Sequence, residues 1–248
     1  MAEETLARGV HTELRDRVAL ITVSDPERRN AMAVDLSAQL VEQIQRAEAD
    51  PGVGAVVVTG ASPGFCAGAN LDELGASKEA GLRRVYAGFM AVANCTLPTI
   101  AAVNGPAVGA GLNLAFACDL RIAGPGAALG ATFSRIGLHP GGGCTYFLVR
   151  ALGPQRALAL LLDGATLTAE ESLAAGLVLR IVPDPVAAAL ELAGRYADLD
   201  PSLVRDIKET VTLAIDHDLS TVVDFESWAQ AASAKRPAVQ AAVARFAR

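Results

Sequence analysis

The sequence predicts an α/β fold, because short apolar segments typical of buried strands alternate with longer segments of helical periodicity. Hydrophobic residues make up 52% of the 248 residues and charged residues 19%, which is enough apolar content for a substantial core. Length alone allows one large domain or two small ones. No segment of the sequence repeats at a fixed period.

The first half of the chain alternates strands and helices. The expected strands are short and rich in β-branched or small apolar residues, and they cover 18–23, 55–59, 99–103 and 120–123. The expected helices cover 35–49, 78–94 and 112–117. In the first of these, Leu36, Leu40 and Ile44 recur at helical spacing, and Pro51 and Gly52 follow its end.

The second half is mainly helical. Gly153 and Pro154 separate two expected helices, and Gly176 ends a third. These helices cover 146–152, 155–162 and 169–175. A last strand is expected at 177–182, and no strand signal follows residue 186. The remaining apolar periodicity predicts helices at 201–215, 220–233 and 238–246.

Charge and cysteine usage narrow the class of protein. The net charge is −6 with no basic stripe, so we expect no nucleic-acid partner. No run of about eighteen apolar residues is present, so we expect no membrane span, and the polar N-terminus lacks the apolar core of a signal peptide. The four cysteines have no CxxC spacing and indicate free thiols, no metal site and a cytoplasmic location. They are Cys66, Cys95, Cys118 and Cys144.

A glycine-rich loop, NGPAVGAGLN at 104–113, lies between an expected strand and an expected helix. Gly105, Gly109 and Gly111 leave the backbone open to a ligand. The first amides of the helix have no acceptor inside it and lie at the positive end of its dipole, an arrangement that can stabilise an oxyanion. The alternative is a tight turn whose glycines serve close packing.

A second small-residue turn, FCAGANLDEL at 65–74, also follows an expected strand. Together with NGPAVGAGLNLAFACDLRIA it resembles the crotonase superfamily, the enoyl-CoA hydratase/isomerase fold, and ERRNAM at 27–32 and IGLHPGGG at 136–143 extend the match. The resemblance implies a crotonase-like spiral of ββα units over 1–185. It also implies a C-terminal helical region over 186–248 that forms homotrimers, or dimers of trimers, and caps the active site.

The resemblance also implies a catalytic arrangement. Backbone amides of Ala69 and Ala110 would hold the thioester oxygen of an acyl-CoA substrate, with coenzyme A as part of the substrate and no permanently bound cofactor. Hydratases of this family use two glutamates, and the matching positions here are Asn113 and Phe133. Neither side chain can act as a general base, so we expect efficient hydration to be lost.

Other side chains are weaker candidates for proton transfer. His139 is the best, although a histidine bonded to a turn backbone is the more common case. Cys144 follows three glycines at an expected helix start, where a thiolate would be favoured, but a buried thiol is the more common alternative. Asp72 and Glu73 fit an ordinary first helical turn better than a catalytic role.

Coenzyme A contacts are implied near ERRNAM and FCAGANL. Arg28 and Arg29 are alternatives for a phosphate contact, and the remaining implied contacts are Ala31, Ala67, Ala69 and Leu71.

Two functional hypotheses of different class remain. One is an enzyme that passes through a thioester enolate, and the other is a non-catalytic acyl-CoA-binding protein on the same scaffold. A serine peptidase is disfavoured because no Gly-x-Ser-x-Gly is present, and a Rossmann dehydrogenase because the third glycine of its motif is missing.

Overall fold

The computed structural model describes residues 6–70 and 79–246. The chain divides into two compact units, Met1–Ala197 and Asp198–Arg248. This division lies one helix beyond the expected boundary at 185/186, because α7 (Pro185–Ala197) packs on the sheet of the first unit. Across the described ranges, no helix has the length and apolar character needed to cross a membrane.

The first unit is built on a six-stranded sheet of order β1-β2-β3-β4-β6-β9. The pair β1–β2 is antiparallel, and the remaining neighbours are parallel. The strands are β1 (Gly9–Arg15), β2 (Val18–Ser24), β3 (Ala55–Gly60), β4 (Thr99–Val103), β6 (Leu120–Ala123) and β9 (Arg180–Ile181). The predicted α/β class is confirmed.

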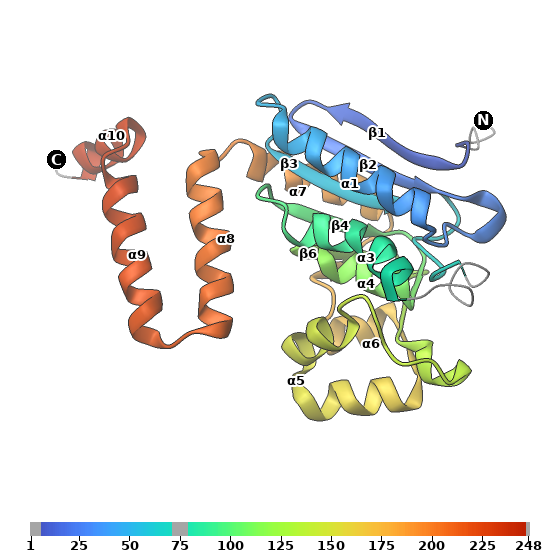
Figure 1. The fold of residues 1–248 in the computed structure, drawn as a ribbon. Helices are drawn as coiled ribbons and strands as arrows, with labels where there is room; N and C mark the ends of the chain where they lie inside the picture. Colours follow the sequence, from blue (N-terminus) through green and yellow to red (C-terminus); the bar gives the residue numbers. More distant parts are fainter. Residues whose placement is uncertain (1–5, 71–78, 247–248) are drawn as a thin grey trace. The chain divides into compact units, whose positions relative to one another are not determined.

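Alternate residues of the strands contribute to two separate cores, as the period of two requires. Val56 and Val58 of β3 face a core shared with α1 (Val34–Ala49), α3 (Glu79–Ala93) and α4 (Ala110–Ala117). Ala55 and Val57 face Ala189, Leu192 and Ala193 of α7. Figure 1 shows α1 and α3 in front of the strands and α7 behind them. The sheet is therefore buried on both faces, which explains its nearly continuous apolar strands.

A second, smaller sheet has the strand order β5-β7-β8, and β5 lies within the glycine-rich segment 104–113. It contains β5 (Pro106–Val108), β7 (Ala128–Gly130) and β8 (Thr166–Thr168). The helical segments around it are η2 (Thr132–Ile136), α5 (Cys144–Asp163) and α6 (Ala169–Ala174). Gly153 has non-helical backbone angles inside α5, which matches the expected break at Gly153–Pro154.

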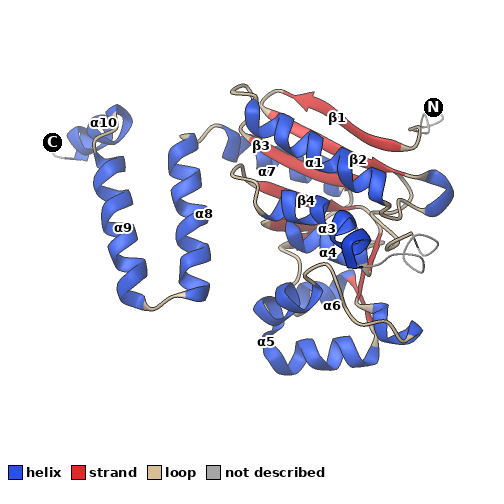
Figure 2. Ribbon diagram, in the orientation of Figure 1, coloured by secondary structure: helices blue, strands red, loops and turns tan. Residues whose placement is uncertain are grey.

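The second unit is helical over its described residues (Figure 2). It contains α8 (Pro201–Asp216), α9 (Leu219–Ala234) and α10 (Pro237–Phe246). Asp200 and Asp218 cap α8 and α9 by accepting hydrogen bonds from the amides of their first turns. The three predicted helices of the tail are confirmed within two residues at each end.

Candidate active site

Two backbone turns from separate parts of the chain lie next to each other. Cys66 forms a parallel bridge with Ala107, and Met32 forms one with Ala69. The Cys66 amide donates to the Pro106 carbonyl at 3.0 Å, and the Met32 amide donates to the Gly68 carbonyl at 2.8 Å. The segment 66–70 therefore lies between the 29–32 segment and the glycine-rich loop that precedes α4.

Glycine is required in both turns. Gly68 has φ of +125° and Gly109 has φ of +56°, conformations that other residues rarely adopt. A Cβ on Gly109 would lie 3.9 Å from the Gly68 Cα, so the turns face each other closely. A Cβ on Gly111 would lie 2.0 Å from the Cys66 carbonyl oxygen. Close packing thus explains why residue 111 is a glycine, whereas the backbone conformation of the turn explains why residue 109 is one.

The amides of Ala69 and Ala110 donate no hydrogen bond to any other residue that the structure describes. Ala110 is the first residue of α4, where an amide has no acceptor inside the helix. The ladder of α4 begins only where the Asn113 amide donates to the Gly109 carbonyl at 3.2 Å. Two neighbouring turns therefore each present an amide donor that is available to a ligand.

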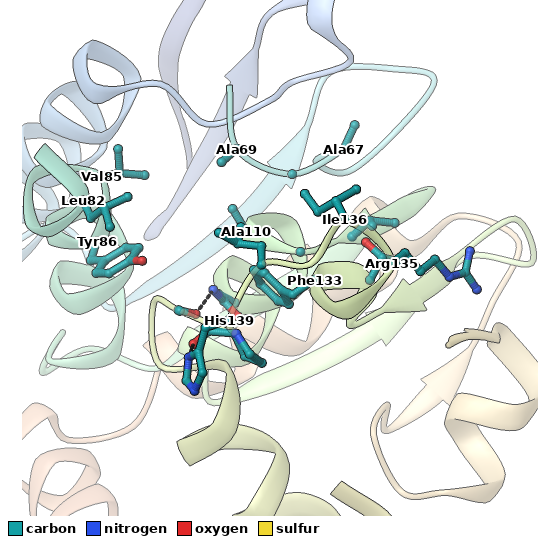
Figure 3. Close-up of a pocket in the computed structure, with 18 residues that line it drawn as sticks. Ala67, Ala69, Leu82, Val85, Tyr86, Ala110, Phe133, Arg135, Ile136 and His139 are labelled. Carbon is teal, nitrogen blue, oxygen red and sulfur yellow. Dashed lines mark hydrogen bonds between the residues drawn. The ribbon is translucent and has the colours of Figure 1, made fainter. Parts of the chain in front are cut away.

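These amides border a cavity of about 590 Å³ within the first unit. Its walls come from the 67–69 turn, one face of α3, the start of α4 and the segment 132–141. Figure 3 shows Ala69 and Ala110 on facing segments, with Phe133 beside Ala110. Among the described lining residues there is no aspartate or glutamate, and the ionisable ones are Tyr86, Arg135 and His139.

Asn113 and Phe133, the positions that match the family glutamates, both line this cavity. Asn113 is 2% exposed, and its Nδ2 donates to the Gly141 carbonyl at 2.8 Å. Its Oδ1 is buried and has no hydrogen-bond partner among the described residues. The Phe133 ring is half-buried, and its Cζ would lie 3.9 Å from a Cβ on Gly109. The ring therefore lies over the glycine turn and keeps that wall apolar.

His139 lines the cavity but is exposed, and its Nδ1 lies 2.7 Å from the Pro140 carbonyl oxygen. This is the turn-bonded state that the sequence offered as the alternative to a base. With the hydrogen on Nδ1, the Nε2 atom keeps a lone pair that can accept a proton. The geometry of His139 therefore allows a hydrogen bond to the turn through Nδ1 and a role as a base through Nε2.

Only some of the residues expected to contact coenzyme A line the cavity. The Ala67 amide donates to the Arg29 carbonyl at 3.0 Å, so the 29–31 segment lies along the 67–69 turn, but only Ala67 and Ala69 line the cavity. Arg28 lies 3.7 Å from Glu27, whereas Arg29 forms no ion pair within the described part of the chain. Leu71, Asp72 and Glu73 lie outside the described residues.

Cys144 does begin a helix, α5, but it is buried, and burial raises the pKa of its thiol to about 12. Of the two alternatives for Cys144, the structure therefore favours the buried thiol, because desolvation disfavours the charged thiolate. Burial likewise raises the pKa of Cys66 to about 11.

Sequence reasoning missed Tyr86, Leu82 and Val85, which line the cavity from α3, and Arg135, which lines it from η2. The signal in α3 was its helical spacing, since Leu82, Val85, Tyr86 and Phe89 follow an i, i+3, i+4, i+7 pattern. That pattern identifies a buried face, but it does not say which part of the face borders a cavity.

Comparison with known proteins places the chain in a family. A profile described as enoyl-CoA hydratase/isomerase matches residues 13–248. The "Probable enoyl-CoA hydratase EchA14" of Mycobacterium tuberculosis H37Rv is 58% identical over 198 residues, covering 78% of this chain and 77% of that protein.

Solved structures agree with the sequence comparison. An enoyl-CoA hydratase subunit from Geobacillus kaustophilus HTA426 superposes with a TM-score of 0.89 at 31% identity, covering 96% of this chain and 94% of that one. A Thermobifida fusca YX protein in complex with acetoacetyl-CoA gives a TM-score of 0.84 at 32% identity, covering 94% and 97%. The chain therefore belongs to the enoyl-CoA hydratase/isomerase family and has the fold of the crotonase superfamily.

Proposed function

We propose that this chain acts on an acyl-CoA thioester and stabilises the enolate form of its carbonyl with the Ala69 and Ala110 amides. The observation that carries the proposal is the pair of uncommitted amides on facing turns at the edge of one cavity. Such donors favour the charge that develops on the thioester oxygen over the neutral carbonyl. The acetoacetyl-CoA complex of the Thermobifida relative supports this class of ligand.

The coenzyme A moiety would leave the cavity past Ala67, alongside the 29–31 segment. Arg29 is the better placed of the two arginines for a phosphate, because Arg28 already lies near Glu27. Coenzyme A is then part of the substrate.

The reaction of the enolate would be one that needs few proton transfers to or from side chains of the protein. Hydration of an enoyl thioester places a hydroxyl on the third carbon and a proton on the second, and relatives of this family use two glutamates for these transfers. Here the matching positions hold Asn113 and Phe133, and the described cavity wall has no carboxylate. This absence favours a second candidate function, in which the chain binds acyl-CoA without turnover.

Ala110→Pro tests the enolate proposal. Proline lacks the amide hydrogen but is accepted at the first position of a helix, so α4 should persist. We expect turnover of a panel of acyl-CoAs to fall about 10²–10³-fold, the usual cost of one oxyanion donor. Ala169→Pro is the matched control, because Ala169 is the first residue of α6 and does not line the cavity.

Unchanged turnover and affinity in a folded Ala110→Pro variant would refute the role of the amide. If the unmodified chain binds acyl-CoA but turns over none of the panel, the non-catalytic function is the correct one. In that case Ala110→Pro should weaken acyl-CoA binding and leave binding of free coenzyme A unchanged.

A further inference from the structure

Arg8, which precedes β1, connects two carboxylates from later parts of the chain. Its Nε donates to Asp25 Oδ2 at 3.0 Å, and its Nη2 donates to Asp35 Oδ1 at 2.8 Å. The Asp25 side chain is 1% exposed, and within the described ranges no other cation forms an ion pair with it. Because a buried carboxylate is costly without a partner, the charge of Asp25 depends on Arg8.

Asp25 also fixes the short turn that follows it in the sequence. Its Oδ1 accepts a hydrogen bond from the Arg28 amide at 3.2 Å, and its carbonyl accepts one from the Asn30 amide at 2.9 Å. The Asn30 Oδ1 returns a contact by accepting from the Asp25 amide at 2.9 Å. Arg29 and Asn30 both have positive φ, +51° and +61°, which residues with a Cβ adopt rarely. Such backbone persists only where surrounding contacts hold it, and Asp25 supplies three of them here.

This turn lies against the segment that carries the Ala69 amide. The amides on either side of Ala69 both donate to it, that of Ala67 to the Arg29 carbonyl at 3.0 Å and that of Asn70 to the Met32 carbonyl at 2.9 Å. The direction of the Ala69 amide is therefore set by the 29–32 segment, to which both of its neighbours are bonded.

We propose that Arg8 is a positioning residue for the Ala69 amide and thereby for recognition of the thioester oxygen. The pair Arg8–Asp25 fixes the 28–30 turn, and that turn fixes the 67–70 segment. A donor that is already aimed at the thioester oxygen needs no reorganisation when the ligand binds. The inference rests on the proposed function where it concerns the ligand, whereas the positioning itself can be measured in the free protein.

The charge of Asp25 makes the effect of Arg8 specific. Loss of Arg8 would leave a buried carboxylate without its cation, and movement of this carboxylate toward water would release the Arg28 amide. Asp25→Asn removes the charge and keeps an oxygen that can accept from the same amide. Loss of Arg8 should therefore be harmful only while residue 25 is charged. A role of Arg8 in packing alone would not depend on that charge.

Hydrogen–deuterium exchange, followed by mass spectrometry on the free protein, tests the positioning. In Arg8→Gln the amides of the 66–70 segment should exchange about tenfold faster, because their hydrogen bonds to the 29–32 segment open more often. The double variant Arg8→Gln with Asp25→Asn should return the exchange rate to within about twofold of the unmodified protein. Arg15→Gln is the matched control, because Arg15 lies on β1 and pairs with the exposed Glu13, and it should leave the 66–70 segment unchanged.

Isothermal titration calorimetry with butyryl-CoA tests the connection to the ligand. Arg8→Gln should raise the Kd about fivefold, and the double variant should restore it. Unchanged exchange of the 66–70 segment in Arg8→Gln would overturn the inference, as would a double variant that exchanges as fast as Arg8→Gln. If the exchange responds as expected but the Kd is the same in every variant, the positioning by Arg8 stands and the proposed role of the Ala69 amide fails.

Discussion

The carbonyl oxygen of Cys66 lies where a side chain on Gly111 would have to be, since a Cβ there would approach it to 2.0 Å. This contact presses the first turn of α4 onto the strand-like segment 66–70. It is supported by the hydrogen bond from the Val108 amide to the same Cys66 carbonyl, at 3.1 Å. The two turns that carry the Ala69 and Ala110 amides are held together by this packing.

Gly111→Ala should therefore destabilise the fold and weaken ligand binding together. The neighbour is backbone and cannot rotate away, so we expect a loss of about 1–3 kcal/mol in the free energy of unfolding, measured by urea denaturation. Gly126→Ala is the control, because a Cβ there meets nothing within 4 Å. It should change stability by about 0.5 kcal/mol or less. Equal stability of the two variants would contradict the packing argument.

Crotonyl-CoA hydration by the unmodified protein should be about 10⁴-fold or more below that of a competent relative, because general acid–base groups contribute about 10²–10⁴ each. Loss of the enoyl thioester absorbance measures the rate. The double variant Asn113→Glu with Phe133→Glu should raise it, although the larger side chain at 113 must displace the Gly141–Gly142 turn. Phe133→Leu, which adds no carboxylate, should not raise the rate of hydration. Fast hydration by the unmodified protein would show that another group acts as the base.

The buried thiols predict a pH dependence of stability. Burial raises the pKa of Cys66 from 9.0 to about 11 and that of Cys144 from 9.0 to about 12. Above pH 9 the unfolded chain binds fewer protons than the folded one, so the free energy of unfolding should fall as pH rises. Each thiol contributes up to about 1.4 kcal/mol per pH unit.

Urea denaturation at pH 8, 9 and 10 measures this slope. Cys144→Ala is the comparison, since it removes one buried thiol and should make the decline shallower. An identical slope in the two proteins would contradict the assignment of the pH dependence to Cys144.

The second unit should mediate self-association into trimers. Large apolar side chains of α8 and α9 are exposed in the isolated chain, including Ile207, Val211, Leu219 and Trp228. An apolar surface of this kind marks an interface. Light scattering should give about three times, or six times, the 25.5 kDa chain mass. Trp228→Glu should lower the mass, whereas Gln230→Glu on the same helix should not. A monomer at micromolar concentration would contradict the prediction.

Local sequence pattern determined most of the regular elements. The strands 99–103 and 120–123 have the predicted bounds, because short apolar runs with β-branched residues between turn residues favour a buried strand. The glycine turns were recognisable for a similar reason, since few residue types other than glycine tolerate their backbone. The helices of the tail followed from apolar spacing of 3.6 residues. These features depend on neighbours in the sequence, so the sequence alone was sufficient for them.

Tertiary structure decided the features that depend on distant partners. The predicted strand 177–182 pairs with β6 only at Arg180–Ile181, because the Leu177 amide donates instead to the Ser172 carbonyl at 2.8 Å, in the turn after α6. The strands β5, β7 and β8 have three residues each, too few for any periodicity, and form because they find one another. Tyr86 showed only the pattern of a buried helix face. Its place beside Asn113 follows from the packing of α3 and α4 against the Gly141–Gly142 turn, contacts between residues far apart in the chain that no local pattern encodes.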